Sequence, residues 1–147
     1  MFERLTTFFR SKPATPEPLP ELDAKYALGT LLVRVAQADS AYLFEEIEQI
    51  DRTLAEWNDL NPVEAAKMRA MCERLAHTIA DDAELAGLIR NHVDYAHRLE
   101  AVQALWRVAR SDGITDTREQ ALVDLVETHL GIERTDSEEA RLASVIP

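Results

Sequence analysis

The chain has 147 residues, 46% of them hydrophobic, and a formal net charge of −11. It is long enough for one domain with a substantial core, and it needs neither a metal ion nor a disulfide to fold. The excess of acidic residues opposes the counterion release that drives nucleic-acid binding, so neither DNA nor RNA is expected as the main partner.

The single cysteine, Cys72, has no partner for an internal disulfide, which indicates a reducing compartment. No apolar run approaches the roughly 20 residues that span a bilayer. The N-terminus also lacks the continuous apolar core of a signal peptide. A soluble, cytoplasmic protein is therefore expected.

The first twelve residues, MFERLTTFFRSK, predict a short amphipathic arm with three basic residues against one acidic residue. Such an arm suits a weak, peripheral contact with an anionic membrane surface at the inner face of the membrane, or with a partner. Folding back onto the acidic body and remaining mostly disordered are the alternatives. The residues expected to make the contact are Phe2, Leu5, Phe8, Phe9 and Arg10.

Residues 13–21 hold four of the six prolines and predict an extended linker. Prolines and glycines are sparse in the remaining domain, residues 22–147, so we expect it to be all-α. Apolar residues in the segment 95–111 recur at steps of three and four, as on one face of a helix. The expected helices are 22–38, 43–57, 62–79, 82–92, 95–111, 117–130 and 136–144.

Several of these helices have start and stop signals. Asn61 with Glu64 predicts a capping box around a proline at the first helical position. The pairs Asp81 and Glu84, Asp116 and Glu119, and Thr135 and Glu138 repeat this spacing. Gly113 and Gly131 are expected as left-handed stops.

The chain contains an internal two-fold repeat. A shift that places residue 32 on residue 105 matches Leu, Arg, Val, Ala and Asp in the segments 32–39 and 105–112, and it carries Glu46 onto Glu119. Each unit is predicted to be a helix that ends in Asp, a short turn, and a second helix with Glu in its first turn.

The turn of the second unit brings three carboxylates within reach of one another. Asp112, Asp116 and Glu119 offer the oxygen ligands that Ca²⁺ or Mg²⁺ prefers, and Gly113 permits a sharp turn. Helix capping by Asp116 and Glu119 explains the same residues without an ion, and the two interpretations are compatible.

The remaining candidates are weaker. Scattered histidines, the lone Cys72 and the absence of a readable nucleophile or phosphate-loop motif give no positive evidence for catalysis. Trp57 and Trp106 lie in apolar stripes and are expected to pack in the core, each indole nitrogen with a partner.

Residues 105–119, followed by the helix through Leu130-Gly131, resemble the signature of the TerB-like tellurite-resistance family. That signature is a helix ending in an (A/S)-D-G turn, a Glu seven residues after the Asp, and a helix finishing in L-G. Residues 38–46 resemble the earlier copy, with Ser40 where Gly is usual and Leu43 where the second unit has Asp116.

The resemblance covers residues 22–144 and implies an all-α bundle of about seven helices. This fold is shared with the N-terminal domain of DjlA-type co-chaperones. The resemblance also implies an association with tellurite and chemical-stress resistance and a divalent-cation site. Carried over by position, the metal ligands are Asp112, Asp116, Glu119, Asp39 and Glu46.

We therefore expect a non-enzymatic scaffold that binds Ca²⁺ or Mg²⁺ and engages protein partners, including a second copy of itself. The alternative is a metal-independent helical adaptor, brought to the membrane or to a partner by its N-terminal arm.

Overall fold

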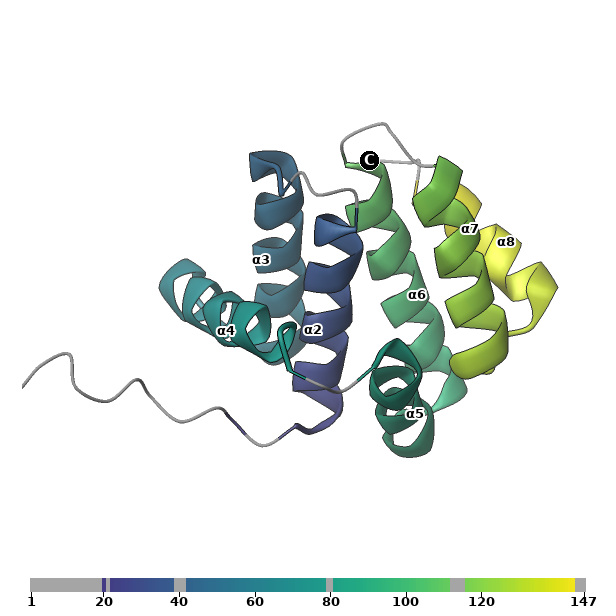
Figure 1. Cartoon of the computed structure of the whole chain (residues 1–147), viewed down its shortest axis with the longest axis horizontal. Coiled ribbons are helices and arrows are strands. Elements are labelled where there is room, and N and C mark those ends of the chain that lie inside the picture. Colours follow the sequence, from purple (N-terminus) through teal and green to yellow (C-terminus); the bar gives the residue numbers. More distant parts are fainter. Residues whose placement is uncertain (1–19, 21, 39–41, 79–80, 112–115, 145–147) are drawn as a thin grey trace, which may run out of the picture.

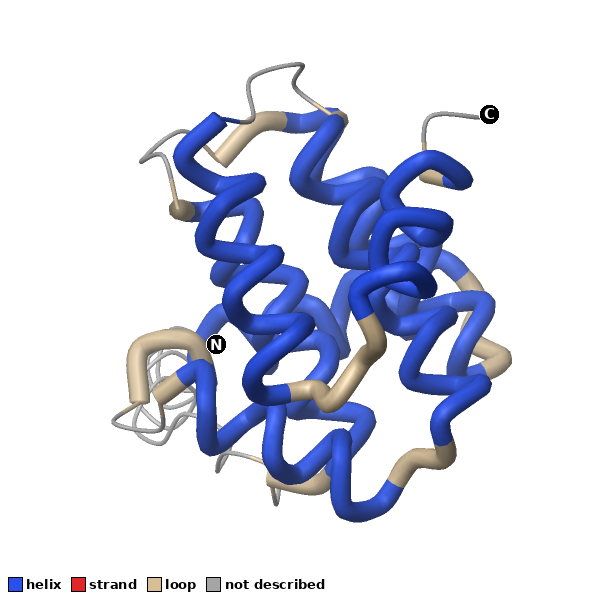
Figure 2. Tube along the Cα trace, turned by 90° about the vertical axis from the view of Figure 1, so that its right-hand side faces the viewer, coloured by secondary structure: helices blue, strands red, loops and turns tan. Residues whose placement is uncertain are grey.

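The structure is a computed structural model that describes residue 20 and residues 22–38, 42–78, 81–111 and 116–144, apart from the side chains of residues 116 and 118. Within these ranges every regular element is a helix, as predicted (Figure 2). The predicted arm, residues 1–12, and all of the linker, residues 13–21, except residue 20 lie outside the described residues. The elements are α2 (Ala24–Gln37), α3 (Phe44–Asn58), α4 (Pro62–Leu75), α5 (Asp82–His92), α6 (Tyr95–Arg110), α7 (Asp116–Asp124), the π-helical turn η1 (Leu125–His129) and α8 (Arg134–Ala143).

Helix α2 is the centre of the bundle. It contacts α3, α4, α5 and α6, while α8 packs on α6 (Figure 1). Helices α2 and α6 run in the same direction and α3 runs against both. The end of α2, the start of α3, the end of α6 and the start of α7 consequently lie at one end of the molecule, at the top of Figure 1.

The central position of α2 follows from its sequence, which is apolar around most of its circumference. Its buried polar side chain, Thr30, donates a hydrogen bond of 2.7 Å to the carbonyl oxygen of Tyr26. Gly29 permits a close approach to α4, because a Cβ atom there would lie 2.5 Å from Sγ of Cys72. The core therefore depends on a small residue where α2 and α4 meet.

The internal repeat is visible in the helix boundaries. Helix α2 ends at Gln37 and α6 ends at Arg110, which are equivalent positions under the shift of residue 32 onto residue 105. The helices that follow begin within one residue of equivalence, at Phe44 and Asp116.

Two predicted helix starts are confirmed. Asn61 accepts from the Glu64 amide at 2.9 Å, and the Glu64 carboxylate accepts from the Asn61 amide at 3.0 Å. Asp81 accepts from the Glu84 amide at 2.8 Å at the start of α5.

The predicted start of the last helix at Thr135 and Glu138 is wrong. Helix α8 begins at Arg134, with Glu133 as its N-cap residue. The Glu133 amide donates to the Tyr95 hydroxyl at 3.1 Å, so a side chain of α6 satisfies a backbone group that precedes the helix.

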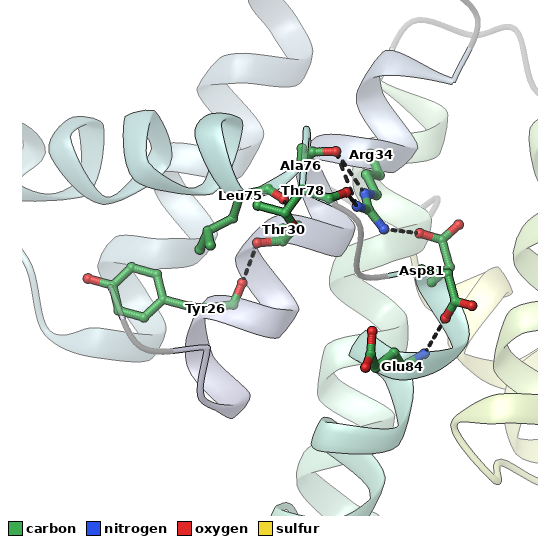
Figure 3. Close-up of polar contacts among 9 residues, drawn as sticks. Tyr26, Thr30, Arg34, Leu75, Ala76, Thr78, Asp81 and Glu84 are labelled. Atoms are coloured by element: carbon green, nitrogen blue, oxygen red, sulfur yellow. Dashed lines mark hydrogen bonds and ion pairs between the residues drawn. The ribbon is translucent and has the colours of Figure 1, made fainter. Parts of the chain in front are cut away.

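Helix α4 ends at Leu75, earlier than the predicted residue 79. The Arg34 guanidinium donates to the carbonyl oxygen of Ala76 at 3.1 Å and to that of Thr78 at 3.4 Å. It also pairs with Asp82 at 3.0 Å, so one side chain of α2 joins the end of α4 to the start of α5 (Figure 3).

The segment 117–130 is not one regular α-helix. Its last turn is the π-helix η1, in which the Leu130 amide donates to the Leu125 carbonyl oxygen at 3.1 Å. The predicted left-handed stop at Gly131 is confirmed by its φ of 68°. Gly113, the other predicted stop, lies outside the described residues.

The two tryptophans differ. Trp106 is fully buried, as predicted, but its indole nitrogen has no hydrogen-bond partner among the described residues. The core prediction for Trp57 is wrong, since this residue near the end of α3 is 36% exposed.

Candidate functional site

The candidate site lies at the end of the bundle where α2, α3, α6 and α7 meet (Figure 1). Of its five predicted ligands, Asp39 and Asp112 lie outside the described residues, as does the side chain of Asp116. Glu46 and Glu119 are described, and their surroundings show how the fold uses each carboxylate.

Glu46 lies in the first turn of α3 and is fully buried. Its Oε1 accepts a hydrogen bond of 3.1 Å from the Leu43 amide. A leucine side chain has no acceptor, so at this helix start only the glutamate half of a capping box forms. Glu46 thus satisfies the backbone amide of Leu43, the residue at the position equivalent to Asp116.

Glu119 lies in the first turn of α7 and is held by arginines from two other helices. Its Oε1 lies 2.7 Å from Nη2 of Arg110 on α6 and 3.7 Å from Nη1 of Arg141 on α8. Arg141 also pairs with Glu138 at 2.9 Å. This network ties α6, α7 and α8 together beside Trp106, whose ring lies 5.9 Å from the Arg110 guanidinium carbon.

As they stand, the two described carboxylates do not fit a cation site. Glu46 is buried as a backbone acceptor, and the charge of Glu119 is neutralised by Arg110. Across the described ranges, no group of three or more His, Cys, Asp or Glu side chains lies close enough to hold a metal ion. The metal site stays a prediction that depends on Asp39, Asp112 and Asp116.

A second polar cluster joins α3 to α4 and was missed from the sequence. Arg69 pairs with Asp51 at 2.6 Å and with Glu73 at 3.3 Å. Burial, followed by the nearby Glu73 carboxylate, raises the pKa of the Tyr42 hydroxyl above its usual range. Opposite charges 18 positions apart could have indicated this pair only if the packing of α3 on α4 had been known.

Cys72 is fully buried where α2 meets α4. Burial raises the pKa of its thiol to about 12, so the reactive thiolate is scarce at neutral pH. The structure thus assigns this side chain to packing.

No helix within the described ranges is long and apolar enough to cross a bilayer.

Comparison with known proteins agrees with the fold and with the signature of the two repeat units. Neither a curated protein nor a solved structure matches the chain. A family model described as Tellurite resistance protein TerB matches residues 25–142. This match spans α2 to α8 almost entirely, and the chain therefore belongs to the TerB family.

Proposed function

We propose that this TerB protein acts in tellurite and chemical-stress resistance as a non-catalytic scaffold that binds a protein partner through the start of α3. TerB domains are in general non-catalytic helical domains. The observation that carries the proposal is an apolar pair left at the surface, Leu43 at 40% exposure and Phe44 at 71%.

The partner's chemistry follows from the surroundings of this pair. Exposed Glu45 adjoins Phe44 on α3, and the whole chain carries a charge of −11. A basic segment with an apolar side chain is complementary to this surface. We also expected a second copy of the chain as a partner. A second copy carries the same negative charge, which opposes self-association. Sedimentation velocity distinguishes self-association from binding of another protein.

The test compares two exposed apolar residues in cells that carry the gene at its normal locus. Phe44→Ser is expected to lower growth in tellurite to the level of a gene deletion. Val63→Ser, which removes a 64%-exposed side chain from the start of α4, is the matched control and should leave growth unchanged.

Both variants should melt within about 2 °C of the wild type, because isolated surface substitutions change stability little. Equal tellurite tolerance of Phe44→Ser and wild type would exclude this surface. Unchanged tolerance on gene deletion would exclude the role in tellurite resistance.

A divalent cation is the second candidate function. The recurrence of an Asp at equivalent positions of the two repeat units, Asp39 and Asp112, supports it. The proposed ligands are Asp112 and Asp116, with Asp39 from the first unit, and Ca²⁺ and Mg²⁺ are the ions that suit carboxylate oxygens. Glu119 would join them only by leaving Arg110.

The cation is tested by the melting temperature of chelator-stripped protein with added Ca²⁺ or Mg²⁺. A ligand that binds only the folded state raises the melting temperature, and Asp112→Asn/Asp116→Asn should abolish that rise. Glu127→Gln on η1 removes an exposed carboxylate elsewhere and serves as the control. No rise at millimolar ion would exclude the site.

We also propose that residues 1–12 bring this scaffold to the cytoplasmic face of a membrane. The support is the segregation of charge, with three basic residues in the arm of a chain whose net charge is −11. Phe2, Leu5, Phe8 and Phe9 would supply the apolar contact and Arg10 part of the attraction to anionic lipid.

A further inference from the structure

A pocket of about 340 Å³ lies between α3 and α6, and three of its lining residues are arginines. Arg52 comes from α3, and Arg107 and Arg110 come from successive turns of α6, which runs against α3 (Figure 1). Glu56 is the one acidic side chain among the lining residues. The lining residues other than Glu56 and the three arginines are neutral and polar. In a chain with a net charge of −11, this pocket concentrates positive charge.

The donors of these arginines outnumber the acceptors around them. Arg107 is half-buried and forms no hydrogen bond or ion pair with any described residue. Nε of Arg110 is buried without an acceptor in the described part of the chain, although Nη2 of the same group donates to Glu119 at 2.7 Å. The nitrogen atoms of Arg107 are not among the buried atoms without a partner, so they are open to water and to a ligand. The buried Nε of Arg110 is the donor whose missing acceptor carries a cost, which a bound anion would relieve.

Arg52 can contribute to the same pocket. Its ion pair with Glu48, at 2.9 Å, joins two side chains that are 60% and 51% exposed. Exposed pairs of this kind contribute little to stability, so Arg52 can turn toward a ligand at small cost.

The chemistry of the lining indicates the kind of anion. A guanidinium group presents parallel N–H donors that match the oxygens of a phosphate group. Glu56 repels anions, so a dianionic phosphate, which engages several arginines, is favoured over a single carboxylate. Two carboxylates outside the lining touch its arginines, Glu48 at 2.9 Å from Arg52 and Glu119 at 2.7 Å from Arg110. Arg107 is therefore the arginine of the pocket whose charge is not paired with a described residue. Charges farther away than about 8 Å are screened by physiological salt.

We propose that the pocket formed by Arg52, Arg107 and Arg110 binds a small phosphate-bearing anion. This site shares no residue with the apolar surface at Phe44, and it adjoins the predicted cation ligands through the pair of Arg110 with Glu119. The proposal requires neither of those functions.

The test is a titration of the full chain with inorganic phosphate at constant ionic strength, with chloride as the reference anion. Side-chain Nε–H resonances of arginine report directly on the groups concerned. We expect saturable shifts of Arg107 and Arg52 at millimolar phosphate. The variant Arg107→Gln should weaken the affinity about tenfold, as expected for loss of a hydrogen bond to a charged group.

Two further variants complete the test. Arg107→Lys keeps the charge but loses the planar fork, and it should bind phosphate more weakly than wild type and more tightly than Arg107→Gln. Arg134→Gln removes an exposed arginine from the start of α8 and should leave the affinity unchanged. Melting curves of all three variants establish that they are folded.

A lipid headgroup and a soluble anion share this chemistry, and flotation with vesicles containing phosphatidic acid separates them. Flotation that requires Arg107 supports the proposal with a lipid source, and a phosphate response without flotation supports it with a soluble source. The proposal is overturned if chloride reproduces the shifts, if millimolar phosphate causes none, or if folded Arg107→Gln binds phosphate as tightly as wild type.

Discussion

Arg110 and Glu119 show how two side chains join helices at the end of the bundle where α6 and α7 meet. Both are about one-quarter exposed, and their pair joins α6 to α7. The sequence predicted Glu119 as a helix cap or a cation ligand, but not the pairing with Arg110. That pairing depends on α6 and α7 lying side by side, which no local motif encodes.

We expect a double-mutant cycle of Arg110→Gln and Glu119→Gln to give a coupling free energy of about 1 kcal/mol, because the pair is partly shielded from water. Urea unfolding of the two single variants and the double variant measures it. Arg52→Gln with Glu48→Gln, an exposed pair on α3, is the control and should couple more weakly. Equal coupling in both cycles would contradict the structural role of Arg110.

His97 provides a pH-dependent contact at the start of α6. Its Nδ1 lies 2.6 Å from Oδ1 of Asp94, and this hydrogen bond raises the pKa of the imidazole above 6.5. The His97 amide, followed by its ring, lowers the pKa of the Asp94 carboxyl. The histidine contribution to stability is therefore complete below its unfolded pKa and is lost as pH rises through the raised folded pKa.

Proton NMR titration of the His97 ring tests this contact. Asp94→Asn should return the pKa of His97 toward 6.5, whereas Glu84→Gln, on α5, should not change it. An unchanged pKa in Asp94→Asn would show that another group causes the shift.

At the scale of elements, the sequence predicted most helices because helix signals are local. Asn61 and Asp81 cap the residues that their spacing indicated. Where the prediction failed, the cause is a contact distant in sequence. The Tyr95 hydroxyl accepts from the Glu133 amide before α8, 38 positions along the chain. The Arg34 guanidinium donates to the carbonyl oxygen of Ala76 at the end of α4, 42 positions along the chain.

The close packing of α2 on α4 makes a sharp prediction. Gly29→Ala places a Cβ atom 2.5 Å from Sγ of the buried Cys72, and this overpacking should lower the free energy of unfolding by about 1–3 kcal/mol. Gly87→Ala, in the middle of α5, meets no atom within 4 Å and should raise it by about 0.5–1 kcal/mol through helix propensity.

Chemical denaturation of both variants measures these changes. Adding Cys72→Ala to Gly29→Ala should recover part of the loss, since it removes the clashing sulfur atom. A stabilising effect of Gly29→Ala comparable to that of Gly87→Ala would mean that α2 and α4 do not pack this closely.

At the scale of the whole molecule, the domain that matches TerB begins at residue 25, well after the arm predicted at residues 1–12. Deleting residues 1–12 should leave the melting temperature of the body nearly unchanged and abolish binding to anionic vesicles, because a proline-rich linker separates the two. Calorimetry and vesicle flotation measure these effects. A large loss of melting temperature would instead make the arm part of the core.

Family membership and the all-helical fold could both be predicted from the sequence, because the repeated Asp and Glu signature and the helical periodicity are local patterns. The pocket of Arg52, Arg107 and Arg110 could not, since it exists only where α3 runs against α6.

The two repeat units use an equivalent arginine in different ways. Arg34 and Arg107 occupy equivalent positions, but Arg34 joins three helices while Arg107 has no partner among the described residues.

The central claim is that the fold itself uses the carboxylates of Glu46 and Glu119, which leaves the surface to bind partners. Side-chain carboxylate chemical shifts of chelator-stripped protein, followed during titration with Ca²⁺ and with Mg²⁺, test it most directly. We predict no saturable shift of the Glu46 or Glu119 carboxylate at millimolar ion, even where Asp112 and Asp116 bind the ion. A saturable shift of the Glu119 carboxylate would contradict the account and make Glu119 a cation ligand.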